Sequence, residues 1–275
     1  MDKSSTNPPA GTLPPGAQLE RVRTQSPLVH CITNYVAMNF AANVLLAAGA
    51  SPAMVHSEKE TAEFAGISGA LTINIGTLSD HWLTGMELAA GAARAANKPW
   101  VLDPVAHHAT SYRRNAITKL LALRPTIIRG NASEIIALDG GISTASGVDA
   151  RDSVEVAAGA AINVAQKHAA VVAVTGEVDF VTDGHQSVRI SGGSHYMPMV
   201  TAMGCALTGL VGAFAAVAPA SPFDATIAAL ACFAVAGEQA AVHAEGPGSF
   251  SWRFLDALAA LTPQSLTDRQ RLARA

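Results

Sequence analysis

The sequence predicts an α/β protein with a central, mostly parallel β-sheet covered by helices on both faces. Short apolar runs bounded by turn signals alternate along the chain with Ala-rich segments of helical length, as in parallel sheets that are buried on both sides. The strands are expected at residues 53–55, 71–75, 100–102, 126–128 and 171–174. The helices between them are expected at residues 37–49, 85–97, 112–123 and 152–168.

The pattern changes after Thr175. Residues 178–182 and 186–190 flank a short Asp-Gly-His segment, which is typical of an antiparallel hairpin at the edge of a sheet. Three helices are then expected at residues 204–218, 223–244 and 250–261.

The domain organisation is expected to be simple. Residues 1–17 are rich in Pro and Gly and lack a basic start followed by an apolar core, which favours a disordered leader over a signal peptide. No internal repeat or linker divides the remainder, so residues 18–275 are expected to form one domain.

Composition narrows the possible partners. Hydrophobic residues make up 49% of the chain and charged residues 14%, which favours burial of surface between subunits. The net charge of −3, without a basic stripe interleaved with aromatic residues, argues against a nucleic-acid partner. The most apolar segments, 206–220 and 225–236, are shorter than the about 20 residues of a membrane span, so no membrane partner is expected.

The number and spacing of the cysteines indicate a reducing cellular compartment. The chain has three, Cys31, Cys205 and Cys232, without CxxC spacing. Neither a disulfide framework nor a structural zinc site is therefore expected, and a cytoplasmic location fits.

Polar residues and glycines stand where the expected strands end. They are Asn74 and Gly76, Asp103, the run 129–131 and the run 175–177. Each one alone is compatible with ordinary turn chemistry. Together they predict a site at one sheet edge, because ligands of parallel sheets bind beyond the carboxyl ends of the strands.

The segment 200–208 passes from an extended stretch through a small-residue turn into an apolar helix. The backbone N–H groups of Met203, Gly204 and Cys205 would lie unpaired at the helix start, where the helix dipole favours a phosphate or a developing oxyanion. The same field would favour the thiolate form of Cys205. The alternative is a small cysteine selected for close helix packing.

Common nucleotide and hydrolase motifs do not occur. The sequence has no GxxxxGK[ST], no GxGxxG after a strand, no GxSxG and no HExxH. Adjacent His107 and His108 would point to different sides of an element and make a poor metal pair.

Asn131 and Glu134 follow a strand and open a helix. One reading is a capping box, in which the two residues close the first turn. The functional reading is that Glu134, together with Asp103, helps to hold Mg²⁺ through water against nucleotide phosphates. Arg129 offers a planar fork for phosphate, and Thr175 would place a hydroxyl beside a nucleotide.

Nine segments together resemble hydroxyethylthiazole kinases, a family of the ribokinase-like superfamily. They occur in the same order and with compatible spacing from about residue 18 to the end of the chain. These segments are residues 27–36, 39–43, 49–54, 71–77, 102–105, 128–134, 174–179, 204–207 and 246–250.

The resemblance implies a three-layer α/β/α fold and ATP- and Mg²⁺-dependent phosphorylation of the primary hydroxyl of 4-methyl-5-(2-hydroxyethyl)thiazole in thiamine biosynthesis. It also implies a homotrimer with sites between subunits, and a role for each residue that matches a family motif. The substrate would be bound by Met54, Asn34 and Ala202, and ATP by Arg129 and Thr175. Mg²⁺ would be held by Asp103 and Glu134. The anion hole would be formed by Met203, Gly204 and Cys205, and Cys205 would replace the catalytic aspartate of related sugar kinases.

One position departs from the family pattern. The family usually has Thr-Gly-x-Gly-Cys where this chain has Ala202 and the bulky Met203 between Thr201 and Gly204. An alanine is costly if position 202 needs a positive φ and is tolerated if the position needs only a close approach of the backbone to the ligand.

A catalytically impaired nucleotide-binding homologue is therefore one alternative function. A hydroxymethylpyrimidine kinase or a nicotinamide-nucleotide repair dehydratase is another, although residues 30–34 and 51–54 resemble the thiazole enzymes specifically.

Overall fold

A computed structural model describes residues 13–141 and 154–275, and these contain a nine-stranded sheet in the order β2-β1-β3-β4-β5-β6-β7-β8-β9. The strands are β1 (Leu28–Ile32), β2 (Ser51–Ala53), β3 (Ala70–Asn74), β4 (Trp100–Asp103), β5 (Ile127–Asn131), β6 (Val171–Thr175), β7 (Val178–Thr182), β8 (Ser187–Ser191) and β9 (Arg271–Arg274). Strands β1 to β6 run parallel to one another, and β7, β8 and β9 each pair antiparallel with the strand before them in the sheet. The predicted mostly parallel sheet is confirmed.

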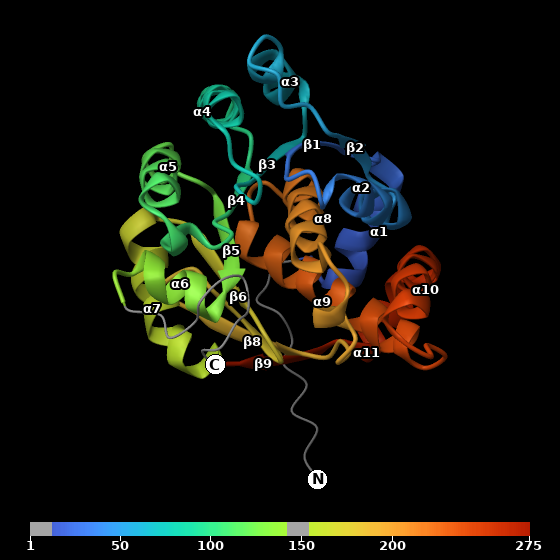
Figure 1. Cartoon of the computed structure of the whole chain (residues 1–275). Coiled ribbons are helices and arrows are strands. Elements are labelled where there is room, and N and C mark those ends of the chain that lie inside the picture. The colour runs from blue at the N-terminus through green and yellow to red at the C-terminus, as the bar shows by residue number, and fades with distance from the viewer. Residues whose placement is uncertain (1–12, 142–153) are drawn as a thin grey trace.

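Helices cover both faces of the sheet, which gives three layers (Figure 1). One face carries α1 (Pro15–Gln25), α2 (Met38–Ala48), α8 (Met203–Val217) and α9 (Pro222–Ala241). The other face carries α4 (Asp80–Ala95), α5 (Ser111–Ala122), α6 (Ala132–Leu138) and α7 (Val154–His168). The remaining helices pack against these, namely α3 (Thr61–Ile67) on α4, α10 (Pro247–Ala260) on α9, and α11 (Pro263–Arg269) on α1.

Alternation along the strands explains why the sequence reads as continuous apolar runs. Successive side chains of a strand point to opposite faces of a sheet. In β4, Val101 packs in the cluster beneath α8 and α9, whereas its neighbour Leu102 packs beneath α4 and α5. A strand buried on both sides therefore has no polar face.

Helix α8 lies unusually close to the sheet. A Cβ added at Gly212 would lie 2.5 Å from Cγ2 of Thr72 on β3, so only glycine permits this approach. The close packing brings the N-terminus of α8 over the carboxyl ends of β3 and β4 (Figure 1).

Helix α9 is the one described helix that is long and apolar enough to cross a membrane. Within its apolar window, 78% of the residues are buried inside the protein, against the sheet, α8 and α10. Its composition is that of a core helix.

Several elements differ from the sequence predictions. Strand β1 was not expected, because the polar His30 interrupts its apolar run; His30 is fully buried, and its Nε2 lies 2.7 Å from the carbonyl oxygen of Val55. The polar strand β9 was also missed, and because it pairs with β8 the predicted hairpin is not at the sheet edge. Helix α1 begins at Pro15, so residues 15–17 of the expected leader are helical, while residues 1–12 lie outside the described residues.

Candidate active site

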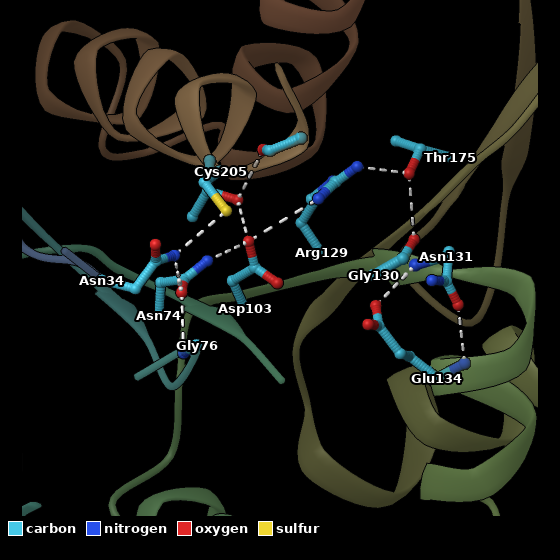
Figure 2. Close-up of polar contacts among 12 residues, drawn as sticks. Asn34, Asn74, Gly76, Asp103, Arg129, Gly130, Asn131, Glu134, Thr175 and Cys205 are labelled. Atoms are coloured by element: carbon cyan, nitrogen blue, oxygen red, sulfur yellow. Dashed lines mark hydrogen bonds and ion pairs between the residues drawn. The ribbon is translucent and has the colours of Figure 1, made fainter. Parts of the chain in front are cut away.

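The candidate site lies at the carboxyl ends of the parallel strands, beneath the first turn of α8 (Figure 2). It lies near β1. In the sheet, β2 lies on one side of β1 and β3 on the other, so the strand order changes direction there. Open parallel sheets bind ligands at such a position. The polar residues that the sequence places at the strand ends do lie together at this edge.

The polar side chains reach the same face of the sheet because of strand periodicity. Asn74 lies two residues after Thr72, which packs against α8. Asp103 and Arg129 likewise lie two residues after Val101 and Ile127, both in the core cluster beneath α8. Residues two apart on a strand share a face, so all three side chains point toward α8.

A chain of hydrogen bonds links the thiol of Cys205 to the carboxylate of Asp103. Asn34 donates through Nδ2 to Cys205 Sγ at 3.3 Å and to Asn74 Oδ1 at 2.9 Å. Asn74 in turn donates through Nδ2 to Asp103 Oδ2 at 2.8 Å. Asn34, Asn74 and Asp103 are almost completely buried (Figure 2).

Two buried carboxylates lie near one another at this edge. Burial raises the pKa of Asp103, while Arg129 and hydrogen bonds from Thr208 and Asn74 oppose the shift. Burial and the charge of Asp103 both raise the pKa of Glu134. The Glu134 carboxylate accepts 2.9 Å hydrogen bonds from the backbone N–H groups of Ala106 and Asn131.

The capping-box reading of Asn131 and Glu134 is confirmed. The Asn131 side chain accepts from the backbone N–H of Glu134 at 2.9 Å, and the Glu134 side chain returns to the backbone N–H of Asn131. This local closure does not exclude a second role, because it holds the Glu134 carboxylate within electrostatic reach of Asp103.

Arg129 occupies the centre of the site. Its Nη1 lies 3.6 Å from Asp103 Oδ2, and its Nη2 donates to Thr175 Oγ1 at 2.5 Å. Its Nε is buried without a hydrogen-bond partner among the described residues. A Cβ at Gly204 would lie 2.8 Å from Nη1, so the guanidinium lies directly against the backbone of the α8 turn. Arg129 and Thr175, both expected to bind ATP, are therefore in contact.

The α8 turn has the geometry of an anion-binding helix start. Ala202 is the N-cap, with φ 66° and ψ 3°, and the helix begins at Met203. No side chain within residues 13–141 or 154–275 caps this end, which leaves the N–H groups of the first turn for a ligand. Position 202 thus does require the left-handed conformation, which alanine adopts at a cost.

The expected activation of Cys205 by the helix dipole is wrong. Burial and the nearby charge of Asp103 raise the pKa of the thiol to about 11, and the hydrogen bond from Asn34, the charge of Arg129 and a weaker interaction with Asn74 only partly oppose this. Cys205 is therefore a neutral thiol at pH 7, because burial disfavours the charged thiolate.

One residue predicted to bind the substrate lies outside the hydrogen-bonded chain of the site, and two residues of the site were not predicted. Met54 is half-buried just after β2 and packs against the core cluster beneath α8, so it is not among the hydrogen-bonded residues. Thr208 was missed, although it follows Cys205 at helical spacing and donates to Asp103 Oδ2 at 2.8 Å. Asp179 was also missed; it accepts from the Gly176 N–H at 2.9 Å, and burial raises its pKa to about 6.

Replacing Ala202 with Gly is expected to raise the free energy of unfolding by about 0.5–1 kcal/mol, since glycine removes the left-handed strain but adds unfolded-state entropy. Ala169→Gly, at φ 50° and away from the site, is the matched control and should stabilise by a similar amount. Urea denaturation measures both. A less stable Ala202→Gly protein would show that the alanine carries no backbone strain.

The thiols are expected to react slowly with iodoacetamide at neutral pH. Burial raises the pKa of Cys31 and Cys205 to about 11 and that of Cys232 to about 12. A raised thiol pKa lowers the thiolate fraction, here to about 10⁻⁴ or less at pH 7, and the rate should rise with pH up to that pKa. Mass spectrometry of the labelled peptides gives the rate at each cysteine. Rapid labelling of Cys205 at pH 7 would contradict a neutral thiol.

Comparison with known proteins assigns the chain to a family. The model of the hydroxyethylthiazole kinase family matches residues 19–264. The chain is 67% identical to the hydroxyethylthiazole kinase of Rhizobium johnstonii over 261 residues, which cover 95% of this chain and 98% of that protein. It is 56% identical to the hydroxyethylthiazole kinase of Gemmatimonas aurantiaca, with 98% and 97% covered.

Solved structures agree. The hydroxyethylthiazole kinase protein of Pyrococcus horikoshii has a TM-score of 0.86 and 37% identity, covering 95% of this chain and 98% of that one. Pyridoxal kinase of Staphylococcus aureus, solved with AMP-PCP and pyridoxal, shares the fold with a TM-score of 0.61 at 17% identity, covering 90% and 98%. The expected ribokinase-like, three-layer α/β/α architecture is confirmed, and the chain belongs to the hydroxyethylthiazole kinase family.

Proposed function

We propose that this protein transfers the γ-phosphoryl group of ATP to the primary hydroxyl of 4-methyl-5-(2-hydroxyethyl)thiazole; its relatives are named hydroxyethylthiazole kinases. The observation that carries the proposal is the meeting of three features at one sheet edge. An uncapped helix start, a buried arginine against its backbone, and a thiol held by an amide lie together at α8. The first two suit phosphate, and the third suits an acceptor alcohol.

The reaction forms a bond between the acceptor oxygen and the γ-phosphorus and breaks the bond from that phosphorus to the β,γ-bridging oxygen. ADP leaves with the electron pair, and the hydroxyl proton is released. Because the transition state is loose, catalysis depends on positioning and on stabilising charge on the transferred group. The N–H groups of residues 203–205 and the Arg129 guanidinium would supply that stabilisation.

Cys205 would act as a neutral thiol that orients the hydroxyl. A group with a pKa of about 11 is poorly suited to remove a proton at pH 7 as a thiolate. Proton loss from the acceptor is late in a loose transition state, so strong basicity is not required. The partly exposed sulfur instead accepts hydrogen bonds and fixes the direction of the acceptor oxygen.

Asp103 and Glu134 fit Mg²⁺ held through water. Both carboxylates are buried with raised pKa values, and the charge of Asp103 itself raises the pKa of Glu134, so an added cation would be stabilised there. Both Glu134 oxygens already accept backbone hydrogen bonds, which favours water-mediated rather than direct coordination. Bound Mg²⁺ would neutralise charge on the nucleotide phosphates.

Substrate and subunit contacts are proposed on the β1–β2 side. Asn34 would contact the hydroxyethyl group and Met54 the thiazole ring. Tyr35 and Val36, directly after Asn34, are 67% and 60% exposed, which supports a homotrimer in which a neighbouring subunit covers this end of the site. The three cysteines are free thiols, which supports a cytoplasmic location.

The direct test incubates the purified protein with ATP, Mg²⁺ and hydroxyethylthiazole, and detects the phosphate ester and ADP by mass spectrometry. A parallel reaction contains hydroxymethylpyrimidine as acceptor. Ester formed only with the thiazole supports the proposal. If neither product forms and calorimetry still detects ATP binding, the impaired homologue is favoured, which the strained alanine at position 202 makes the specific alternative.

A further inference from the structure

Asn74 is the middle member of the chain between thiol and carboxylate, and its orientation is fixed from three sides. Its Oδ1 accepts from Asn34 Nδ2 at 2.9 Å and from the backbone N–H of Gly76 at 2.9 Å. Its Nδ2 donates to Asp103 Oδ2 at 2.8 Å. The side chain is 2% exposed, so water does not compete for these bonds.

Asn74 and a backbone N–H together fix the orientation of Asn34. Asn34 Oδ1 accepts from the backbone N–H of Ala37 at 3.0 Å, and Nδ2 then has two N–H donors to place. One donor is directed to Asn74 Oδ1 and the other to Cys205 Sγ (Figure 2). The sulfur therefore receives a hydrogen bond from Asn34.

We propose that Asn74 is a positioning residue that, through Asn34, holds the Cys205 sulfur as a hydrogen-bond acceptor facing the alcohol. This inference rests on the proposed function of the site. The same carboxamide joins two parts of the site, because its other end restrains the Asp103 carboxylate next to Arg129. Asn74 thus fixes the spacing between Cys205, which would face the acceptor alcohol, and Asp103 with Arg129, which would lie beside the phosphates.

Thr208 provides a matched control. It donates to the same Asp103 Oδ2 at the same 2.8 Å, but it has no hydrogen bond to Asn34. Thr208→Val and Asn74→Ala therefore each remove one donor from Asp103, and only Asn74→Ala releases Asn34. A third variant, Asn74→Asp, keeps an acceptor for Asn34 and Gly76, and by sharing a proton with Asp103 it can also keep that contact.

Steady-state kinetics would be measured for the three variants and for Asn74→Ala combined with Cys205→Ala, with thermal melting to confirm folding. We expect Asn74→Ala to lower kcat about 10-fold or more below Thr208→Val, with a smaller change in KM for ATP, and Asn74→Asp to recover most of that loss. In the Cys205→Ala background, Asn74→Ala should cost no more than Thr208→Val, because the sulfur through which Asn74 acts is gone. Fully additive losses, or equal losses in Asn74→Ala and Thr208→Val, would overturn the proposal.

A crystal structure of each variant gives a readout that is independent of turnover. The distance from Asn34 Nδ2 to Cys205 Sγ should exceed hydrogen-bonding range in Asn74→Ala and remain near 3.3 Å in Thr208→Val and Asn74→Asp. An unchanged distance in Asn74→Ala would refute the inference. If Asn74→Ala does not fold, Asn74→Ser, which is too short to reach both Asn34 and Asp103, takes its place with the same expected lengthening. If the wild-type protein fails to phosphorylate the thiazole, the proposed function fails, whereas these distances still decide whether Asn74 positions Asn34.

Discussion

Replacing Arg129 with Met is expected to lower the free energy of unfolding by about 3–5 kcal/mol and to remove most of the activity. The buried Asp103 would lose its cation, and an uncompensated buried charge is strongly destabilising. The phosphate side would also lose the guanidinium that lies against Gly204. Urea denaturation and kcat/KM for ATP measure the two effects.

Two companion variants separate stability from catalysis. Adding Asp103→Asn to Arg129→Met should restore part of the stability without restoring activity, because it removes the unpaired charge but not the need for the guanidinium. Arg189→Met breaks an ion pair with the exposed Glu155 and should cost about 1 kcal/mol or less. Equal losses of stability at Arg129 and Arg189 would contradict the account of a buried charge pair.

Replacing Cys205 with Ala is expected to lower kcat about 10- to 100-fold without abolishing turnover. Loss of the sulfur leaves the acceptor oxygen less well oriented, and small errors of position are costly to catalysis. Cys205→Asp should keep useful activity because a carboxylate also accepts a hydrogen bond from the alcohol. The control is Cys232→Ala, a fully buried cysteine of α9 outside the site, which should leave kcat unchanged. An unchanged kcat in Cys205→Ala would remove the thiol from the mechanism.

Much of the fold could be predicted from the sequence because most of its strands are buried on both faces and its helices are Ala-rich. The failures have local causes. His30 hides β1 because its polar ring interrupts the apolar run, although its Nε2 lies 2.7 Å from the carbonyl oxygen of Val55, just after the neighbouring strand β2. Strand β9 carries Arg271 and Arg274 and forms by pairing with β8, a tertiary contact that composition does not reveal.

The members of the site could be predicted better than their interactions. Strand ends and the α8 turn identified Asp103, Arg129 and Cys205, since parallel strands deliver such residues to one edge. The protonation of Cys205 could not be predicted, because it depends on burial and on the charge of Asp103, which lies 102 residues earlier in the chain. The hydrogen bonds of Thr208 and Asn74 to Asp103 could not be predicted either, because they depend on how α8 packs against β3 and β4.

The central claim is that the first turn of α8 holds the migrating phosphoryl group while the Cys205 sulfur faces the acceptor alcohol. A crystal structure with hydroxyethylthiazole and a non-hydrolysable ATP analogue tests it most directly. We expect the γ-phosphate to accept hydrogen bonds from the N–H groups of residues 203–205, and the substrate hydroxyl to lie within hydrogen-bonding distance of Sγ. A γ-phosphate bound away from this turn, or a hydroxyl remote from the sulfur, would contradict the account.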